Sequence, residues 1–139
     1  MIILDTNVLS EILRPRPDDG VLAWLARPPR ASLFTTTITR AEVFYGVSVL
    51  PSGTRKQNLW DATLGIFNVD FSGQVLGFDS DAADSYAAIA AHRKSLGRPI
   101  SQFDAMIAAI ARSRGATLAT RNSKDFVDCG IEIVDPWNV

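Results

Sequence analysis

Residues 1–11 read M-I-I-L-D-T-N-V-L-S-E, and this stretch decides the fold. The apolar run Ile2–Leu4 ends at Asp5, and two residues later the apolar positions take a spacing that suits a helix. The stretch predicts a short buried strand followed by a helix from Val8 to about Leu13. Asp5 then lies at the C-terminal edge of the sheet, which is where ligands bind in open α/β folds.

The composition predicts one globular domain spanning residues 1–139. Of the 139 residues, 47% are hydrophobic and 21% are charged, which is enough apolar material for a single core. No apolar run is long enough to span a bilayer and no signal peptide is evident, so we expect a cytoplasmic protein with no membrane contact. Cys129 is the only cysteine and is expected to be a half-buried hydrophobic residue. The net charge of -1 argues against coating nucleic acid by charge alone.

Helices and strands alternate along the rest of the chain. Predicted helices run from Asp18 or Asp19 through Ala26, over Arg40–Leu50 and Thr54–Phe67, from 79–81 to about Leu96, and from 101–104 to Arg114. Predicted strands cover Ser32–Thr37, Gln74–Phe78, Thr117–Ala119 and Ile131–Val134. This alternation predicts an α/β/α sandwich with a mostly parallel sheet of four or five strands.

Topology then directs four acidic residues to one edge of the sheet. Asp5 ends the first strand, and Glu42 is placed in the first turn of the helix that leaves the second strand, with Thr39 as its N-cap in a capping box. Asp104 opens the helix that leads into the fourth strand, and Asp125 follows that strand by six residues. Each residue taken singly has an ordinary explanation as a cap or a loop aspartate. Their shared position is what indicates a functional site.

Carboxylates gathered this closely repel one another unless a proton or a cation neutralises them. Oxygen ligands without cysteine or histidine favour Mg²⁺ or Mn²⁺ over zinc. Such a site suits hydrolysis of a phosphodiester bond.

Four segments together resemble the PIN-domain ribonucleases, in particular the VapC-type toxins of prokaryotic toxin–antitoxin pairs. These segments are I-L-D-T-N-V-L-S-E at 3–11, T-R-A-E at 39–42, F-D-A-M-I-A-A-I-A at 103–111 and A-T-R-N-S-K-D-F at 119–126. They occur in the family's order, and the resemblance covers essentially the whole chain.

The resemblance implies a role for each matching residue. The four acidic positions that bind Mg²⁺ or Mn²⁺ and activate water for RNA cleavage correspond here to Asp5, Glu42, Asp104 and Asp125. Supporting roles, in orienting the carboxylates or a bound water, fall to Asn7, Thr120 and Asn122. The family also implies a homodimer and a small antitoxin that blocks the metal site at one end and binds operator DNA at the other.

Basic and aromatic residues near this edge are candidates for RNA contacts. The candidate phosphate-binding residues are Arg40, Arg98, Arg121 and Lys124. Phe44, Tyr45, Tyr86 and Phe103 could stack on bases, but their helical spacing favours the core, and the tryptophans at 24, 60 and 137 are interpreted as core or dimer-interface anchors. His92 has no motif neighbour and is expected at the surface.

Two other classes of protein also place an aspartate after the first strand. Haloacid-dehalogenase-like phosphatases need a second aspartate two residues later, where this chain has Asn7. A receiver-like signalling domain requires paired acidic residues at the end of the first strand and an aspartate after the third strand. Asp79 could fill the second requirement, but Thr6 follows Asp5.

Overall fold

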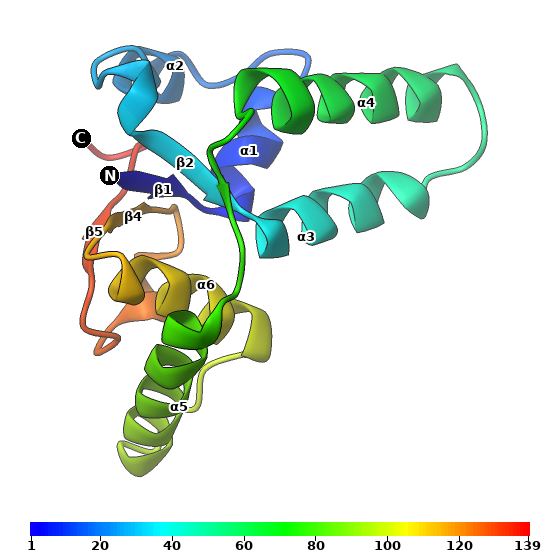
Figure 1. Cartoon of the computed structure of the whole chain (residues 1–139). Coiled ribbons are helices and arrows are strands. Elements are labelled where there is room, and N and C mark those ends of the chain that lie inside the picture. The colour runs from blue at the N-terminus through cyan, green and yellow to red at the C-terminus, as the bar shows by residue number, and fades with distance from the viewer.

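The computed structural model, which describes residues 1–139, contains a five-stranded sheet in the order β3-β2-β1-β4-β5 (Figure 1). Every neighbouring pair of strands is parallel, so the predicted sandwich is confirmed with its sheet fully parallel. The strands are β1 (Ile2–Leu4), β2 (Leu33–Thr36), β3 (Val75–Leu76), β4 (Thr117–Ala119) and β5 (Glu132–Val134).

Six helices cover both faces of the sheet (Figure 1). They are α1 (Thr6–Ile12), α2 (Asp19–Leu25), α3 (Thr37–Ser48), α4 (Thr54–Gly65), α5 (Ser80–Ser95) and α6 (Gln102–Ser113), and a π-helical turn (Ile66–Asp70) continues α4. None of them combines the length and the apolar composition needed to cross a lipid bilayer.

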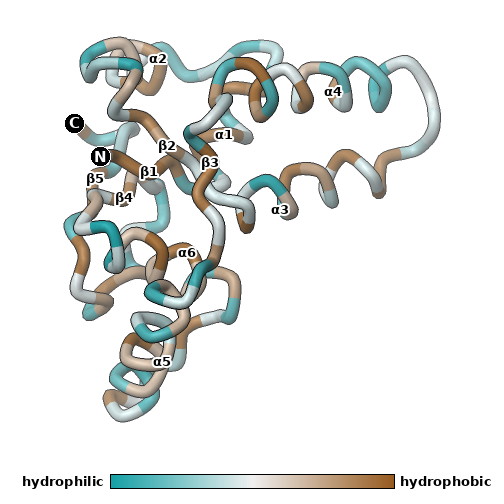
Figure 2. Tube along the Cα trace, viewed as in Figure 1, coloured by the Kyte–Doolittle hydropathy of each residue, from teal (hydrophilic) through white to brown (hydrophobic).

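The two faces of the sheet bury two separate hydrophobic clusters. Successive side chains of a strand point to opposite faces, so Ile3 packs with α5 and α6 while Leu4 packs with α1 and α2. Leu118 and Ala119 of β4 divide between the clusters in the same way. Strand β1, which contributes to both clusters, is brown in Figure 2, the colour of hydrophobic residues.

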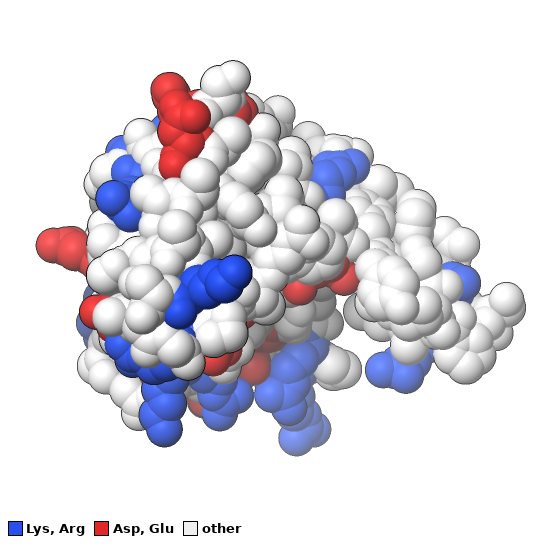
Figure 3. Space-filling model, turned by 90° about the horizontal axis from the view of Figure 1, so that it is seen from below, with Lys and Arg blue, Asp and Glu red and all other residues white.

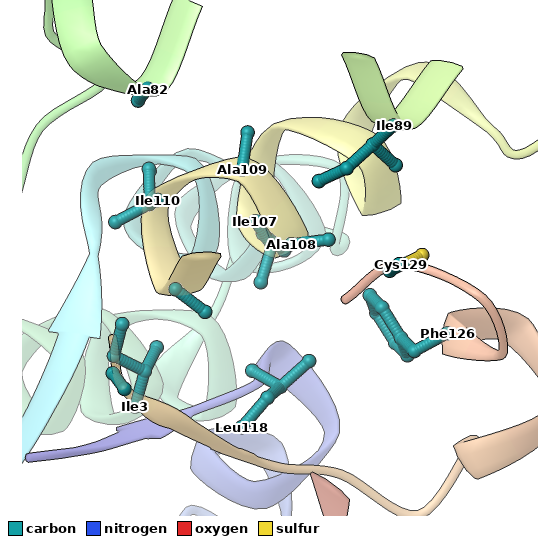
Figure 4. Close-up of a cluster of buried hydrophobic side chains, with 12 residues drawn as sticks. Ile3, Ala82, Ile89, Ile107, Ala108, Ala109, Ile110, Leu118, Phe126 and Cys129 are labelled. Atoms are coloured by element: carbon teal, nitrogen blue, oxygen red, sulfur yellow. The ribbon is translucent and has the colours of Figure 1, made fainter. Parts of the chain in front are cut away.

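Helix α6 packs closely on the sheet because most of its inward side chains are alanines. Figure 4 shows Ile107 and Ala108 facing Leu118 of β4, with Phe126 and Cys129 completing the cluster. Small side chains bring the helix axis near the strands. Only Arg114, Gly115 and Ala116 then join α6 to β4, and Gly115 adopts a φ of 61°, a left-handed conformation that ends a helix.

Helices α3 and α4 form an arm that projects from the body of the molecule (Figure 1). Phe44 of α3 packs edge-on against Trp60 of α4, with ring centroids 4.8 Å apart. The prediction of core packing is confirmed for Phe44 and Tyr86. It is wrong for Tyr45 and Phe103, which are 70% and 51% exposed.

The capping box predicted at Thr39–Glu42 is also wrong. Helix α3 begins at Thr37, and Thr36 is its N-cap, accepting a hydrogen bond from the Thr39 backbone N–H at 3.1 Å. Thr36 is still extended as the last residue of β2, so it has the backbone conformation of a cap. Glu42 therefore lies in the second turn of α3, where its side chain is free to serve another purpose.

Candidate active site

Three of the four predicted carboxylates line one open cavity at the C-terminal edge of the sheet. Asp5 comes from the end of β1, Glu42 from the second turn of α3, and Asp104 from the first turn of α6. Figure 3 shows acidic side chains in the recess where the arm joins the body, with basic side chains around it. The parallel sheet brings these segments to the same edge, as the topology predicted.

Asp5 is held at the centre of the site by three donors. Its Oδ1 accepts a hydrogen bond from the Thr6 backbone N–H at 2.8 Å, so Asp5 also caps α1. Its Oδ2 accepts one from the Thr120 hydroxyl at 2.7 Å and one from the Asn7 amide at 3.3 Å. The predicted supporting residues Asn7 and Thr120 therefore contact the carboxylate directly.

The predicted supporting residue Asn122 acts through its backbone. Its N–H donates to the Thr120 hydroxyl oxygen at 3.1 Å, and the Asn7 side chain donates to the same oxygen at 3.1 Å. With both acceptor positions of that oxygen used, the Thr120 proton points to Asp5. The Asn122 side chain itself lines the cavity.

Burial disfavours the ionised form of Asp5. The side chain is 4% exposed, and desolvation raises its pKa to about 6, with the charges of Asp104 and Glu42 adding to the effect of burial. The pKa of Asp104 is raised mainly by burial as well, and the charge of Asp125 contributes. Two carboxylates with raised pKa values in one cavity are typical of a functional site.

Glu42 is oriented by threonines rather than by a cap. Thr6 donates its hydroxyl proton to Oε1 of Glu42 at 2.9 Å, and the Thr6 and Thr39 hydroxyl oxygens lie 3.1 Å apart. Thr6 therefore contacts two of the three carboxylates: its backbone N–H donates to Asp5 and its hydroxyl donates to Glu42. Sequence reasoning assigned no role to Thr6, because its partner is 36 positions away.

Asp125 lies beside this cavity without lining it. It belongs to a short 3₁₀ turn, Ser123–Phe126, and its side chain is exposed. Its charge acts on Asp104 and is absent from the causes that shift the pKa of Asp5. Asp125 thus affects the site through its charge on Asp104 and not as part of the cavity lining.

Four further residues line the cavity that the sequence analysis did not assign to the site: Ser10, Glu11, Arg14 and Trp137. Glu11 is 4% exposed and accepts hydrogen bonds from Arg14, at 3.2 Å to Oε1, and from the Asp18 backbone N–H at 3.0 Å. Arg14 lines the cavity on the same side, and Trp137 lines it from near the C-terminus. Glu11 lies in the last turn of α1, six residues after Asp5, and this spacing does not put the two residues on one face of a helix, so the sequence carried no signal for it.

The four candidate phosphate-binding residues have different surroundings. Arg121 lines the cavity, and its guanidinium lies 5.0 Å from the centre of the Trp137 ring. Arg40 donates to Asn68 at 2.9 Å, and Arg98 forms an ion pair with Asp128. Lys124 is exposed.

Three other residues that the sequence analysis discussed, His92, Cys129 and Asp79, lie outside the cavity. His92 is exposed on α5, as expected. Cys129 is completely buried, more than expected, and burial raises the pKa of its thiol. Asp79, the residue that a receiver domain would require, caps α5 through the Ala82 backbone N–H and lies 3.6 Å from Arg114.

The carboxylates supply only oxygen donors, which suits a hard divalent cation. No three acidic, histidine or cysteine side chains lie close enough to hold one ion together. Mg²⁺ commonly uses one or two protein carboxylates and completes its shell with water and substrate phosphate oxygens. The open cavity, lined by Asp5, Glu42 and Asp104, fits that mode of binding better than a closed protein cage.

Comparison with known proteins agrees with this geometry. The family model described as PIN domain matches residues 2–130. The chain is 39% identical to VapC ribonuclease Y4jK of Sinorhizobium fredii, over 99% of this chain and 98% of that protein. It is 37% identical to Toxin FitB of Neisseria gonorrhoeae, over 99% of both chains.

The structural comparison gives the same result. A solved structure of FitAB bound to the IR36 DNA fragment superposes with a TM-score of 0.93 at 37% identity, covering 100% of this chain and 97% of that one. Sequence motifs, parallel sheet and acidic cavity thus agree with the family match along nearly the whole chain. This chain belongs to the PIN-domain family.

Proposed function

We propose that this chain is a divalent-metal-dependent endoribonuclease and the toxin of a type II toxin–antitoxin pair. The observation that carries the proposal is the convergence of Asp5, Glu42 and Asp104 on one open cavity, in a chain whose relatives include a VapC ribonuclease. A single domain spanning residues 1–139 would contain the whole site.

Each carboxylate has its own part in the reaction. Asp5 and Asp104 would hold Mg²⁺ or Mn²⁺, with Asp125 supporting Asp104. Such a cation would lower the pKa of a water molecule and offset charge on the phosphate. Glu42 keeps Oε1 on the Thr6 hydroxyl, while its Oε2, which accepts no hydrogen bond, is available to take a proton from the attacking water.

RNA binds through local contacts, because the net charge of -1 provides no general attraction. Arg121 and Arg14 lie on the cavity wall and are placed to bind phosphates, with Lys124 exposed nearby in sequence. The exposed ring of Phe103 lines a shallow hollow together with Glu42 and Asp104, where it can stack on a base beside the scissile bond.

The partner is a small antitoxin. The FitAB structure contains a FitB-type chain in a complex on DNA. By analogy, a segment of the antitoxin would enter the acidic cavity here and stop RNA from reaching it, while its DNA-binding end recognises the operator. We further propose a homodimer acting in the cytoplasm, where RNA is available.

The test measures cleavage of a mixed RNA pool by the purified chain. Cleavage should require Mg²⁺ or Mn²⁺, stop in EDTA and return when excess Mn²⁺ is added. Expression without the antitoxin should arrest growth of the host, and Asp104→Asn should abolish the arrest. Full cleavage in EDTA, or normal growth despite abundant folded protein, would reject the proposal.

A further inference from the structure

Arg93, near the end of α5, is a buried charge that the proposed reaction does not use. Its side chain is 6% exposed, and it forms no ion pair with any carboxylate. Removing a guanidinium from water costs several kcal/mol unless its donors are satisfied. The hydrogen-bond acceptors of the Arg93 side chain therefore indicate its role.

Three of the four partners of Arg93 are backbone carbonyls, and two of these belong to the loop that carries Asp125. Nη1 of Arg93 donates to the carbonyl oxygen of Asp125 at 2.8 Å and to that of Val127 at 3.1 Å, and it lies 3.7 Å from Sγ of Cys129. Nε donates to the carbonyl oxygen of Arg98 at 2.7 Å. One side chain thus joins the end of α5, the connection to α6 and the loop that carries Asp125.

The loop needs such a support because it has little regular structure. After the single turn at Ser123–Phe126 the chain runs through Asp128, whose φ of 62° is unusual for a residue with a side chain. Phe126 anchors the loop in the core, but an apolar anchor does not fix the direction of the neighbouring backbone. Hydrogen bonds to the carbonyls on both sides of Phe126 do fix it.

The charge of Arg93 also reaches the acidic centre. Burial raises the pKa of Asp104 and Asp125 raises it further, whereas the positive charge of Arg93 acts in the opposite direction. Arg93 and Asp125 therefore both lie close enough to Asp104 for their charges to act on it.

We propose that Arg93 is a positioning residue that holds the Asp125 backbone so that the Asp125 carboxylate stands beside Asp104. The inference rests on the proposed metal-dependent function and adds a residue to it. Lysine cannot replace the arginine, because it lacks the planar group whose Nε and Nη1 bond to separate carbonyls.

The experiment is a double-mutant cycle between Arg93→Met and Asp125→Asn, read as the Kd for Mn²⁺ by electron paramagnetic resonance and as kcat and KM for RNA. We expect Arg93→Met to weaken Mn²⁺ binding about tenfold and to lower kcat with KM nearly unchanged. In the Asp125→Asn background the same substitution should change Mn²⁺ binding less than twofold, because the carboxylate that it positions is gone.

The melting temperature of each variant shows whether it is folded, so that a loss of Mn²⁺ binding in a folded variant is not a loss of structure. If Arg93→Met does not fold, Arg93→Lys replaces it in the cycle. Asp128→Asn is the matched control, since it removes the ion pair with Arg98 but leaves the Arg93 hydrogen bonds in place. Equal effects of the Arg93 substitution in both backgrounds, or wild-type Mn²⁺ binding by a folded Arg93 variant, would overturn the inference. A wild-type chain that neither binds Mn²⁺ nor cleaves RNA would instead overturn the proposed function.

Discussion

Thr120 donates its hydroxyl proton to Oδ2 of Asp5 at 2.7 Å, although 115 positions of sequence separate the two residues. The contact exists because β1 and β4 are neighbours and both end at this edge of the sheet. A completely buried hydroxyl thereby orients the most deeply buried of the four predicted carboxylates.

Thr120→Val should lower both stability and activity. The substitution keeps the shape of the side chain but leaves Asn7 and the Asn122 N–H without their acceptor, at a cost of about 1–3 kcal/mol. Urea unfolding and RNA cleavage measure the two effects. Thr120→Ser retains the hydroxyl and should recover most of the activity. A valine variant with wild-type cleavage would show that Asp5 needs no orienting partner.

The stability of the metal-free protein should fall as the pH rises through 6. The pKa of Asp5 is about 6 in the folded chain and 3.8 for an exposed aspartate, so between these values the folded state binds more protons than the unfolded state. The contribution of Asp5 to the free energy of unfolding is complete below pH 3.8 and is lost above pH 6. The free energy of unfolding should therefore fall by about 1 kcal/mol between pH 5 and pH 8.

The measurement for this pH effect is urea unfolding in EDTA across that range, for the wild type and for Asp5→Asn. The asparagine loses hydrogen bonds at every pH, but it cannot titrate. The difference in unfolding free energy between the two chains should therefore change with pH. A constant difference would mean that Asp5 ionises normally in the folded protein.

Asp104→Asn should abolish RNA cleavage without destabilising the fold. The side chain is half-buried, burial raises its pKa, and the amide removes a charge that Asp125 repels. We expect an unchanged or higher melting temperature at pH 8, with cleavage reduced at least a hundredfold. Asp84→Asn, an exposed aspartate on α5, is the control and should keep both properties. An Asp104 variant that unfolds would point to a structural role instead.

Phe103→Ala should raise KM for RNA more than it lowers kcat. Stacking on an aromatic ring contributes about 1–3 kcal/mol per base, which corresponds to roughly a five- to hundredfold change in KM. The ring is 51% exposed, so little stability is lost. Tyr45→Ala removes a ring that is 70% exposed on the arm, and it should leave KM unchanged. If Phe103→Ala altered only the oligomeric state, the ring would be a subunit contact and not a base platform.

The local sequence was sufficient to predict the order of the elements and the edge at which the carboxylates meet. A strand that stops at Asp5 and the short link between α6 and β4 carry that information, because chain direction in a parallel α/β sheet follows from short connections. The family resemblance implied supporting roles for Thr120 and Asn7, and in the structure both donate hydrogen bonds to Asp5.

Only the tertiary structure decided which side chains hold which carboxylates. Thr36 displaced Thr39 as the cap of α3 because the end of β2 was already extended, and Glu42 turned to Thr6 on another helix. Glu11 and Trp137 reached the cavity, and Arg93 reached the Asp125 loop, through packing between distant segments. Hydrogen bonds between residues far apart in sequence leave no local pattern, since they depend on how the helices dock on the sheet.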